Sequence, residues 1–119
     1  MPGEYSIDTE KRLVVVRFAS RVIAEDITRY AERLRSHPDF EPTFSEIADL
    51  REVEELELQA QDFLKLADTI DPFSVEAKRA FVVRTSVQKH AARMHKILRT
   101  QRHFEIFHSV EEAKQWIES

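Results

Sequence analysis

The chain has 119 residues and a formal net charge of −4, with 42% apolar residues, one Gly and no Cys, which is typical of one globular domain. Because the single glycine is Gly3, the glycine-rich loops of nucleotide-binding proteins and the glycine-flanked nucleophile of α/β-hydrolases are excluded. The absence of Cys also excludes thiol catalysis, cysteine-ligated metals and disulfides.

The first third of the chain predicts a hairpin followed by a helix. Tyr5 and Ile7 alternate with polar residues, and residues 13–18 are almost continuously apolar, so we expect a second strand buried on both faces. Four apolar residues then recur at helical spacing: Ile27, Tyr30, Ala31 and Leu34. They predict an amphipathic helix over residues 24–36, which ends before Pro38.

The middle of the chain predicts a strand, an acidic connection and a second helix. The strand covers residues 44–50, and the connection covers residues 51–57. The second helix is marked by apolar residues that we expect to face inward: Ala60, Phe63, Leu64, Ala67 and Ile70. It ends at the turn formed by residues 71–74.

The last third predicts two further pairs of a strand and a helix. A short strand over residues 80–83 precedes a helix that we expect Ser86 to cap. The inward face of that helix is predicted from four residues: Val87, Ala91, Met94 and Leu98. A strand over residues 104–107 and a helix that opens at the capping box of Ser109 complete the chain.

The predicted order is therefore ββαβαβαβα. After the hairpin, strands and helices alternate, which implies right-handed crossovers. We expect a single α/β domain over residues 1–119, with a mixed, mainly parallel sheet and helices packed on it.

Short motifs spread over most of the chain occur in an order and spacing that carry a resemblance. They are Arg12-Leu13-Val14, Glu25-Asp26-Ile27, Asp49-Leu50-Arg51-Glu52-Val53, Asp71-Pro72-Phe73-Ser74, Ala92-Arg93-Met94 and residues 107–117. With the element order, they resemble the STAS fold of bacterial anti-sigma-factor antagonists and are most similar to the broader SpoIIAA-like family. That family shares fold features with CRAL-TRIO-type lipid carriers. The resemblance implies a non-enzymatic regulatory module without a cofactor.

The sequence departs from the antagonists at their phosphorylation site. In them, a strand that ends in Asp-Leu leads to an Asp-Ser-Ser-Gly turn, whose second serine is phosphorylated. If Asp49-Leu50 is that strand end, the turn falls at residues 57–60, which read Glu-Leu-Gln-Ala. Because these residues carry no hydroxyl group, the resemblance implies the fold without the phospho-switch.

The same resemblance predicts where an unidentified protein partner binds. The surface comprises the loop after the third strand and the start of the second helix. Its residues are Arg51, Glu52, Glu57, Gln59 and Asp62.

An alternative function is a small carrier for a lipid or other apolar molecule, bound between the sheet and the helices. Six aromatic residues would line its pocket: Phe63, Phe73, Phe81, Phe104, Phe107 and Trp116. Ordinary core packing explains the same residues, since each falls at a position where its strand or helix is expected to face inward. The sequence leaves both interpretations open.

The charges are unevenly distributed along the chain. Residues 39–76 contain twelve acidic and two basic residues, whereas residues 78–103 contain eight basic residues and no acidic one. These segments pair within the fold or, in an alternative prediction, between two copies in a homodimer. Lys89, Arg93 and Lys96 form a basic stripe that is a candidate anion-binding site. The acidic pI of about 5.7 and the lack of an RNA-binding aromatic motif argue against nucleic acid as the partner.

The remaining motifs predict neither a metal site nor an acid–base site. His90 and His95 lie about 140° apart on a helix, so they cannot share one metal ion. The acidic run at residues 54–57 is expected to be a solvated surface rather than a catalytic pair of carboxylates. No signal peptide and no apolar run of membrane-spanning length is recognisable, so we expect a cytoplasmic protein.

Overall fold

The computed structural model describes residues 3–119 and confirms the predicted order of strands and helices. The elements are β1 (Glu4–Asp8), β2 (Leu13–Ile23), α1 (Ala24–Ser36), β3 (Ser45–Glu57), α2 (Ala60–Lys65), a π-helical turn η1 (Leu66–Ile70), β4 (Lys78–Val82), α3 (Ser86–Arg99), β5 (His103–Phe107) and α4 (Val110–Glu118). Helix α1 has the predicted bounds, and Asp26 caps it by accepting a hydrogen bond from the backbone N–H of Ile23 (2.9 Å).

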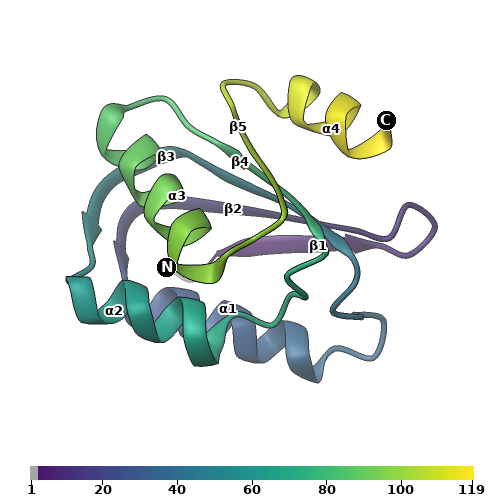
Figure 1. Cartoon of the computed structure of the whole chain (residues 1–119), viewed down its shortest axis with the longest axis horizontal. Coiled ribbons are helices and arrows are strands. Elements are labelled where there is room, and N and C mark those ends of the chain that lie inside the picture. The colour runs from purple at the N-terminus through teal and green to yellow at the C-terminus, as the bar shows by residue number, and fades with distance from the viewer. Residues whose placement is uncertain (1–2) are drawn as a thin grey trace.

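The five strands form one mixed sheet in the order β1-β2-β3-β4-β5. Strand β1 is antiparallel to β2, and the other neighbouring pairs are parallel, as the sequence predicts. Helix α4 covers one face of this sheet, whereas α1, α2 and α3 lie on the other face (Figure 1). We call these the α4 face and the three-helix face.

Strand β2 is buried on both faces, as its apolar run predicts. Val14 and Val16 pack with Leu34 of α1 on the three-helix face, whereas Leu13 packs with Ala113 of α4 on the opposite face. This double burial is typical of strands in sheets that are covered on both sides.

The third strand is longer than predicted, because residues 51–57 continue it instead of forming a loop. They pair with residues 19–23 of β2, so two strands extend as a ribbon beyond the ends of β1 and β4. Val53 within the ribbon is buried, and its carbonyl oxygen accepts a hydrogen bond from the Gln88 side chain (2.8 Å). This part of the strand was not predicted, because its many glutamates alternate only partly with apolar residues.

Helix α3 has its predicted inward face only in part. Its cap is Thr85 rather than Ser86, and Val87 is 63% exposed. The buried positions of the helix are Gln88, Ala91 and Ala92. Of the four predicted inward residues, Ala91 is buried and Met94 and Leu98 are half-buried, so the prediction was wrong for Val87 and did not include the buried Gln88.

The second helix also departs from its expected face. A π-helical turn follows Lys65, and Leu64 is 56% exposed while Leu66 is buried. Leu64 and Ala60, the predicted inward residues that are exposed, both precede this turn, whereas Ala67 within it is buried as predicted.

Candidate functional site

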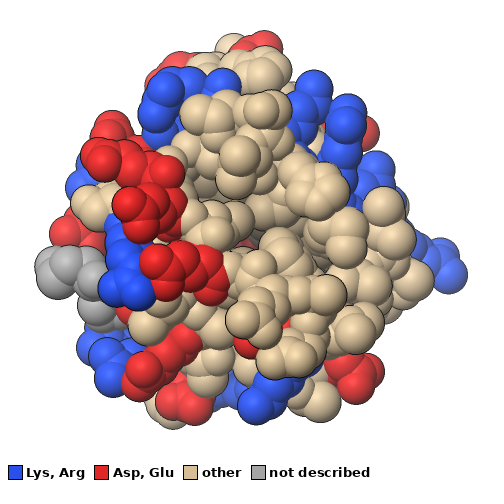
Figure 2. Space-filling model, turned by 90° about the vertical axis from the view of Figure 1, so that its left-hand side faces the viewer, with Lys and Arg blue, Asp and Glu red and all other residues tan. Residues whose placement is uncertain are grey.

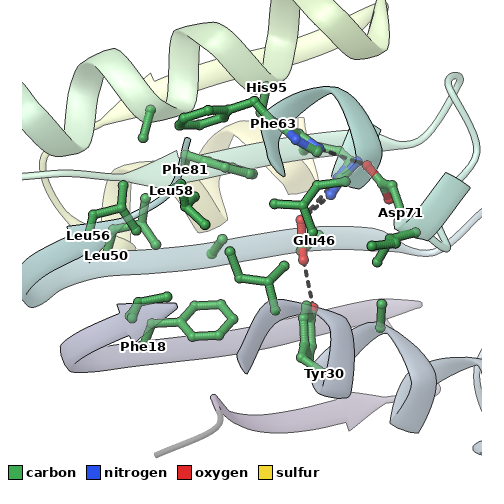
Figure 3. Close-up of a pocket in the computed structure, with 18 of the residues that line it drawn as sticks. Phe18, Tyr30, Glu46, Leu50, Leu56, Leu58, Phe63, Asp71, Phe81 and His95 are labelled. Atoms are coloured by element: carbon green, nitrogen blue, oxygen red, sulfur yellow. Dashed lines mark hydrogen bonds and ion pairs between the residues drawn. The ribbon is translucent and has the colours of Figure 1, made fainter. Parts of the chain in front are cut away.

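A cavity lies on the three-helix face, between the sheet and helices α1, α2 and α3 (Figure 3). One part of its wall is apolar and is formed by residues from β2, β3, β4 and α2, and by the residue that follows β3. They include Phe18, Leu50, Leu56, Leu58, Phe63 and Phe81. The β2–β3 ribbon and α2 thus form the apolar end of the cavity.

The cavity is large enough for a small molecule. About 100 Å³ is open to the centre of a water-sized sphere, whereas one water molecule requires roughly 10–15 Å³ by the same measure. Figure 2 views the side of the molecule where the ribbon ends and shows a hollow surrounded mostly by uncharged residues. Acidic residues gather along one side of this hollow.

The other part of the cavity wall is polar and carries buried charges. Glu46 of β3 accepts two hydrogen bonds from Arg79 of β4, at 3.0 Å from Nε and 2.7 Å from Nη2. Arg79 also donates from Nη1 to Asp71 (2.6 Å) and to Gln101 (3.2 Å). The side chains of Glu46, Asp71 and Arg79 are all at most 4% exposed.

Helices bring two further residues to these charges. Tyr30 of α1 donates its hydroxyl hydrogen to Glu46 Oε2 (2.6 Å), and His95 of α3 lies with Nε2 2.8 Å from Asp71 Oδ2. Figure 3 shows Tyr30, Glu46, Asp71 and His95 gathered at one end of the cavity, away from Leu50 and Leu56. We call Tyr30, Glu46, Asp71, Arg79 and His95 the polar cluster.

The fold explains how these residues meet. Glu46 and Arg79 are register partners on the adjacent parallel strands β3 and β4, so both side chains leave the same face of the sheet. Asp71 follows directly after the π-helical turn, and its Oδ1 accepts a hydrogen bond from the backbone N–H of Phe73 (3.0 Å). That bond fixes the carboxylate at the start of the Pro72 turn.

The polar cluster holds the Asp71 carboxylate ionised and the Tyr30 phenol neutral. Burial alone would raise the pKa of Asp71, but the charge of Arg79 and the hydrogen bond with His95 outweigh burial and hold that pKa well below its usual range. Burial and the neighbouring Glu46 raise the pKa of Tyr30 well above 10.0. At neutral pH, Tyr30 is therefore a neutral donor to an acidic partner.

The predicted partner surface lies elsewhere, on and after the β2–β3 ribbon. Arg51 makes a bidentate pair with Asp49 (3.0 and 2.9 Å), and Glu57 makes one with Arg21 (2.8 and 2.6 Å). Asp62 accepts a hydrogen bond from the backbone N–H of Gln59 (2.8 Å) and so caps α2.

Glu52, the remaining member of this surface, is exposed. Three of the five predicted residues thus belong to a strand, which corrects their placement in a loop.

The structure also places the residues of the basic stripe and the six aromatic residues that were candidates for a pocket. Arg93 and Lys96 are exposed on α3, and Lys89 is half-buried. Of the six aromatic residues, Phe63, Phe73 and Phe81 line the cavity. The other three lie outside its wall: Phe104 packs with Ala92 of α3, and Phe107 packs with Trp116 of α4.

The polar cluster was missed by sequence reasoning, although a signal for it exists. Glu46 lies within the predicted strand over residues 44–50, and Arg79 directly precedes the predicted strand over residues 80–83; a charge within a buried strand requires a partner. Which residue supplies the partner depends on strand register, which the sequence does not reveal. Within residues 3–119, no group of three or more His, Asp or Glu is placed to hold a metal ion.

Comparisons with known proteins identify the fold. No family model matches the chain, and no curated protein matches it. Among solved structures, the chain is similar to an uncharacterized protein of the DUF3478 family from Shewanella loihica PV-4, described as having a SpoIIAA-like fold. The two share 20% sequence identity with a TM-score of 0.67, over 98% of this chain and 94% of the other. The predicted SpoIIAA-like fold is therefore confirmed. Among the described residues, no helix is both long and apolar enough to cross a membrane.

Proposed function

We propose that the chain is a non-enzymatic binding module and that its cavity holds a small, largely apolar molecule. The observation that carries this proposal is the unfilled space behind an apolar wall, on the face of the sheet that three helices cover. Protein interiors are normally packed to the density of organic crystals, and a void lowers stability because its lining loses contacts. A bound molecule would restore those contacts.

The buried charges give further support to a binding role. An ion pair inside a protein is often no more stabilising than apolar residues of the same volume, because both charges lose their hydration. Glu46 and Arg79 occupy positions where alternation along β3 and β4 would accept apolar residues. Buried charges at positions that would otherwise hold apolar residues occur most often at functional sites.

Native mass spectrometry of gently purified protein tests this function. We expect a mass above that of the chain, which is lost on denaturation. The Ala48→Leu variant fills the cavity and should lose the extra mass, since Ala48 lines it. Ala60→Leu adds the same atoms at the exposed start of α2 and should retain the extra mass. A bare chain in every sample, with no added apolar compound bound either, would refute the proposal.

A regulatory protein-interaction surface is the second candidate, and the β2–β3 ribbon favours it. The ribbon projects beyond the neighbouring strands and carries exposed acidic residues, among them Glu52 and Glu57. A SpoIIAA-like fold is compatible with a module that binds a protein partner. Complementary charge would make that partner's surface basic.

Paired substitutions test this surface. Replacing Glu52 and Glu57 by Ala should weaken binding of a captured partner while leaving the melting temperature nearly unchanged. Replacing Glu105 and Glu111, which are also exposed, serves as a control for the loss of two acidic charges. Equal loss of the partner from both double variants would show that only net charge matters and would exclude the ribbon as the specific surface.

A further inference from the structure

The polar end of the cavity contains opposite charges that balance one another. Glu46 and Asp71 are acidic and Arg79 is basic at the cavity wall, and Arg99, which lies outside that wall, has its Nε 3.5 Å from Asp71 Oδ2. An ion of either sign that entered this end would therefore have no counter-charge of its own. Since an isolated ion is costly to move from water into an apolar interior, the cavity disfavours charged ligands.

The donors of Arg79 and Tyr30 are mostly in use, whereas Nε of Arg99, outside the cavity wall, is a buried donor without a hydrogen-bond partner among the described residues. A guanidinium group has five N–H donors, and four of those of Arg79 are engaged by Glu46, Asp71 and Gln101 among residues 3–119. Tyr30 donates its only hydroxyl hydrogen to Glu46. A ligand carboxylate would thus meet at most one free N–H of Arg79, with two protein carboxylates close by.

The acceptors of the cluster, in contrast, have capacity left. Tyr30 lines the cavity and keeps the lone pairs of its hydroxyl oxygen after donating to Glu46. Glu46 Oε2 accepts from Tyr30 at 2.6 Å, and a carboxylate oxygen can accept a second bond.

We propose that the cavity selects an uncharged, mainly apolar molecule with a hydroxyl group or a comparable hydrogen-bond donor, and that it discriminates against fatty acids and other anions. The apolar part of the ligand lies against Leu50, Leu56 and Phe63, and its donor faces Tyr30 and Glu46. This inference rests on the proposed binding function and adds the chemical class of the ligand.

Four probes that share a similar alkyl chain and differ in their polar group test the proposed ligand class: 1-octanol, octanoate, octylamine and octyl methyl ether. Binding is measured at neutral pH on the full chain, from the shifts of leucine methyl resonances during titration. We expect 1-octanol to bind roughly tenfold or more tightly than octanoate and octylamine, because these two bury a charge without a partner. The ether keeps the oxygen but cannot donate, so it should also bind more weakly than 1-octanol.

A variant connects the selectivity to the cluster. Tyr30→Phe removes the phenolic oxygen and should reduce the preference for 1-octanol over the ether, provided that its methyl spectrum shows a folded chain. The comparison of 1-octanol with the ether on the unaltered chain tests the donor even if this variant does not fold. Octanoate binding as tightly as 1-octanol, or the ether as tightly as the alcohol, would overturn the ligand class alone. If none of the four probes shifts the resonances, the ligand class and the proposed binding function both fail.

Discussion

The two faces of the sheet are both covered by helices, but they are packed differently. On the α4 face, Leu13, Ile47, Ala80 and Val82 pack with Ala113 in an apolar cluster, and the one buried charge beside them, Asp49, pairs with the part-exposed Arg51. On the three-helix face, an apolar cluster adjoins the buried charges of Glu46, Asp71 and Arg79 and an unfilled cavity. The same strands contribute to both faces, because successive side chains along a strand point to opposite sides of the sheet.

We infer from this difference that the α4 face mainly stabilises the fold, whereas the three-helix face leaves space for a ligand. A single short helix is enough to close the α4 face, because small and branched apolar residues fill its contact with the sheet. Three helices cover the other face without filling it. We therefore expect substitutions of equal size to have unequal effects on the two faces.

The largest effect should come from breaking the buried ion pairs. Arg79→Met leaves the carboxylates of Glu46 and Asp71 buried without their main partner. Loss of one member of a buried pair typically lowers the free energy of unfolding by about 3–5 kcal/mol. Urea denaturation followed by circular dichroism measures the change. A loss below about 1 kcal/mol, the range of exposed pairs, would show that the cluster is solvated and not part of the core.

Adding volume should distinguish the faces with matched substitutions. Ala80→Leu forces extra atoms into the filled α4 face and should lower the free energy of unfolding by about 1–3 kcal/mol. Ala48→Leu adds the same atoms toward the cavity and should cost clearly less, or stabilise the chain. Thermal and urea denaturation of both variants compare them. If Ala48→Leu is as destabilising as Ala80→Leu, the space beside Ala48 is not available.

The pH dependence of stability should carry the signature of Asp71. Its pKa in the folded chain lies below the unfolded value of 3.8, so the unfolded chain binds more protons at acidic pH. The stability that Asp71 contributes is therefore complete above the unfolded pKa and is lost as pH falls through and below that value.

The Asp71→Asn variant isolates this contribution. The variant should be less stable than the unaltered chain at neutral pH, and the difference should shrink as pH falls below about 4. Denaturation curves at several pH values measure it. A difference that stays constant down to about pH 3 would contradict an ionised Asp71 with a lowered pKa.

The smallest effect is expected at the ion pair on the α4 side of β3. Arg51→Met removes the bidentate partner of Asp49, whose side chain is only 8% exposed, but the Arg51 side chain itself is 38% exposed. We expect a loss in the free energy of unfolding that is smaller than that of Arg79→Met, because only one member of this pair is buried whereas both members of the other pair are. A loss equal to that of Arg79→Met would remove the contrast between the faces.

Apolar spacing was sufficient to predict most of the fold, because α1, α4 and the short strands bury regular apolar faces. It was insufficient where a buried face contains polar residues. Gln88 lies at the centre of the inward face of α3, and the acidic half of β3 is held by pairing with β2. The polar cluster joins residues far apart in the chain, and strand register, which decides that Glu46 meets Arg79, is a tertiary property.

The most direct test of the account is a titration with 1-octanol that is followed at methyl groups on both faces of the sheet. Leu50, Leu56 and Leu58 line the cavity, whereas Leu13, Val15 and Ile47 belong to the α4-face cluster. The account predicts saturable shifts at the first three residues and unchanged positions at the others. Shifts confined to the α4 face, or no saturable shift at the cavity, would contradict it.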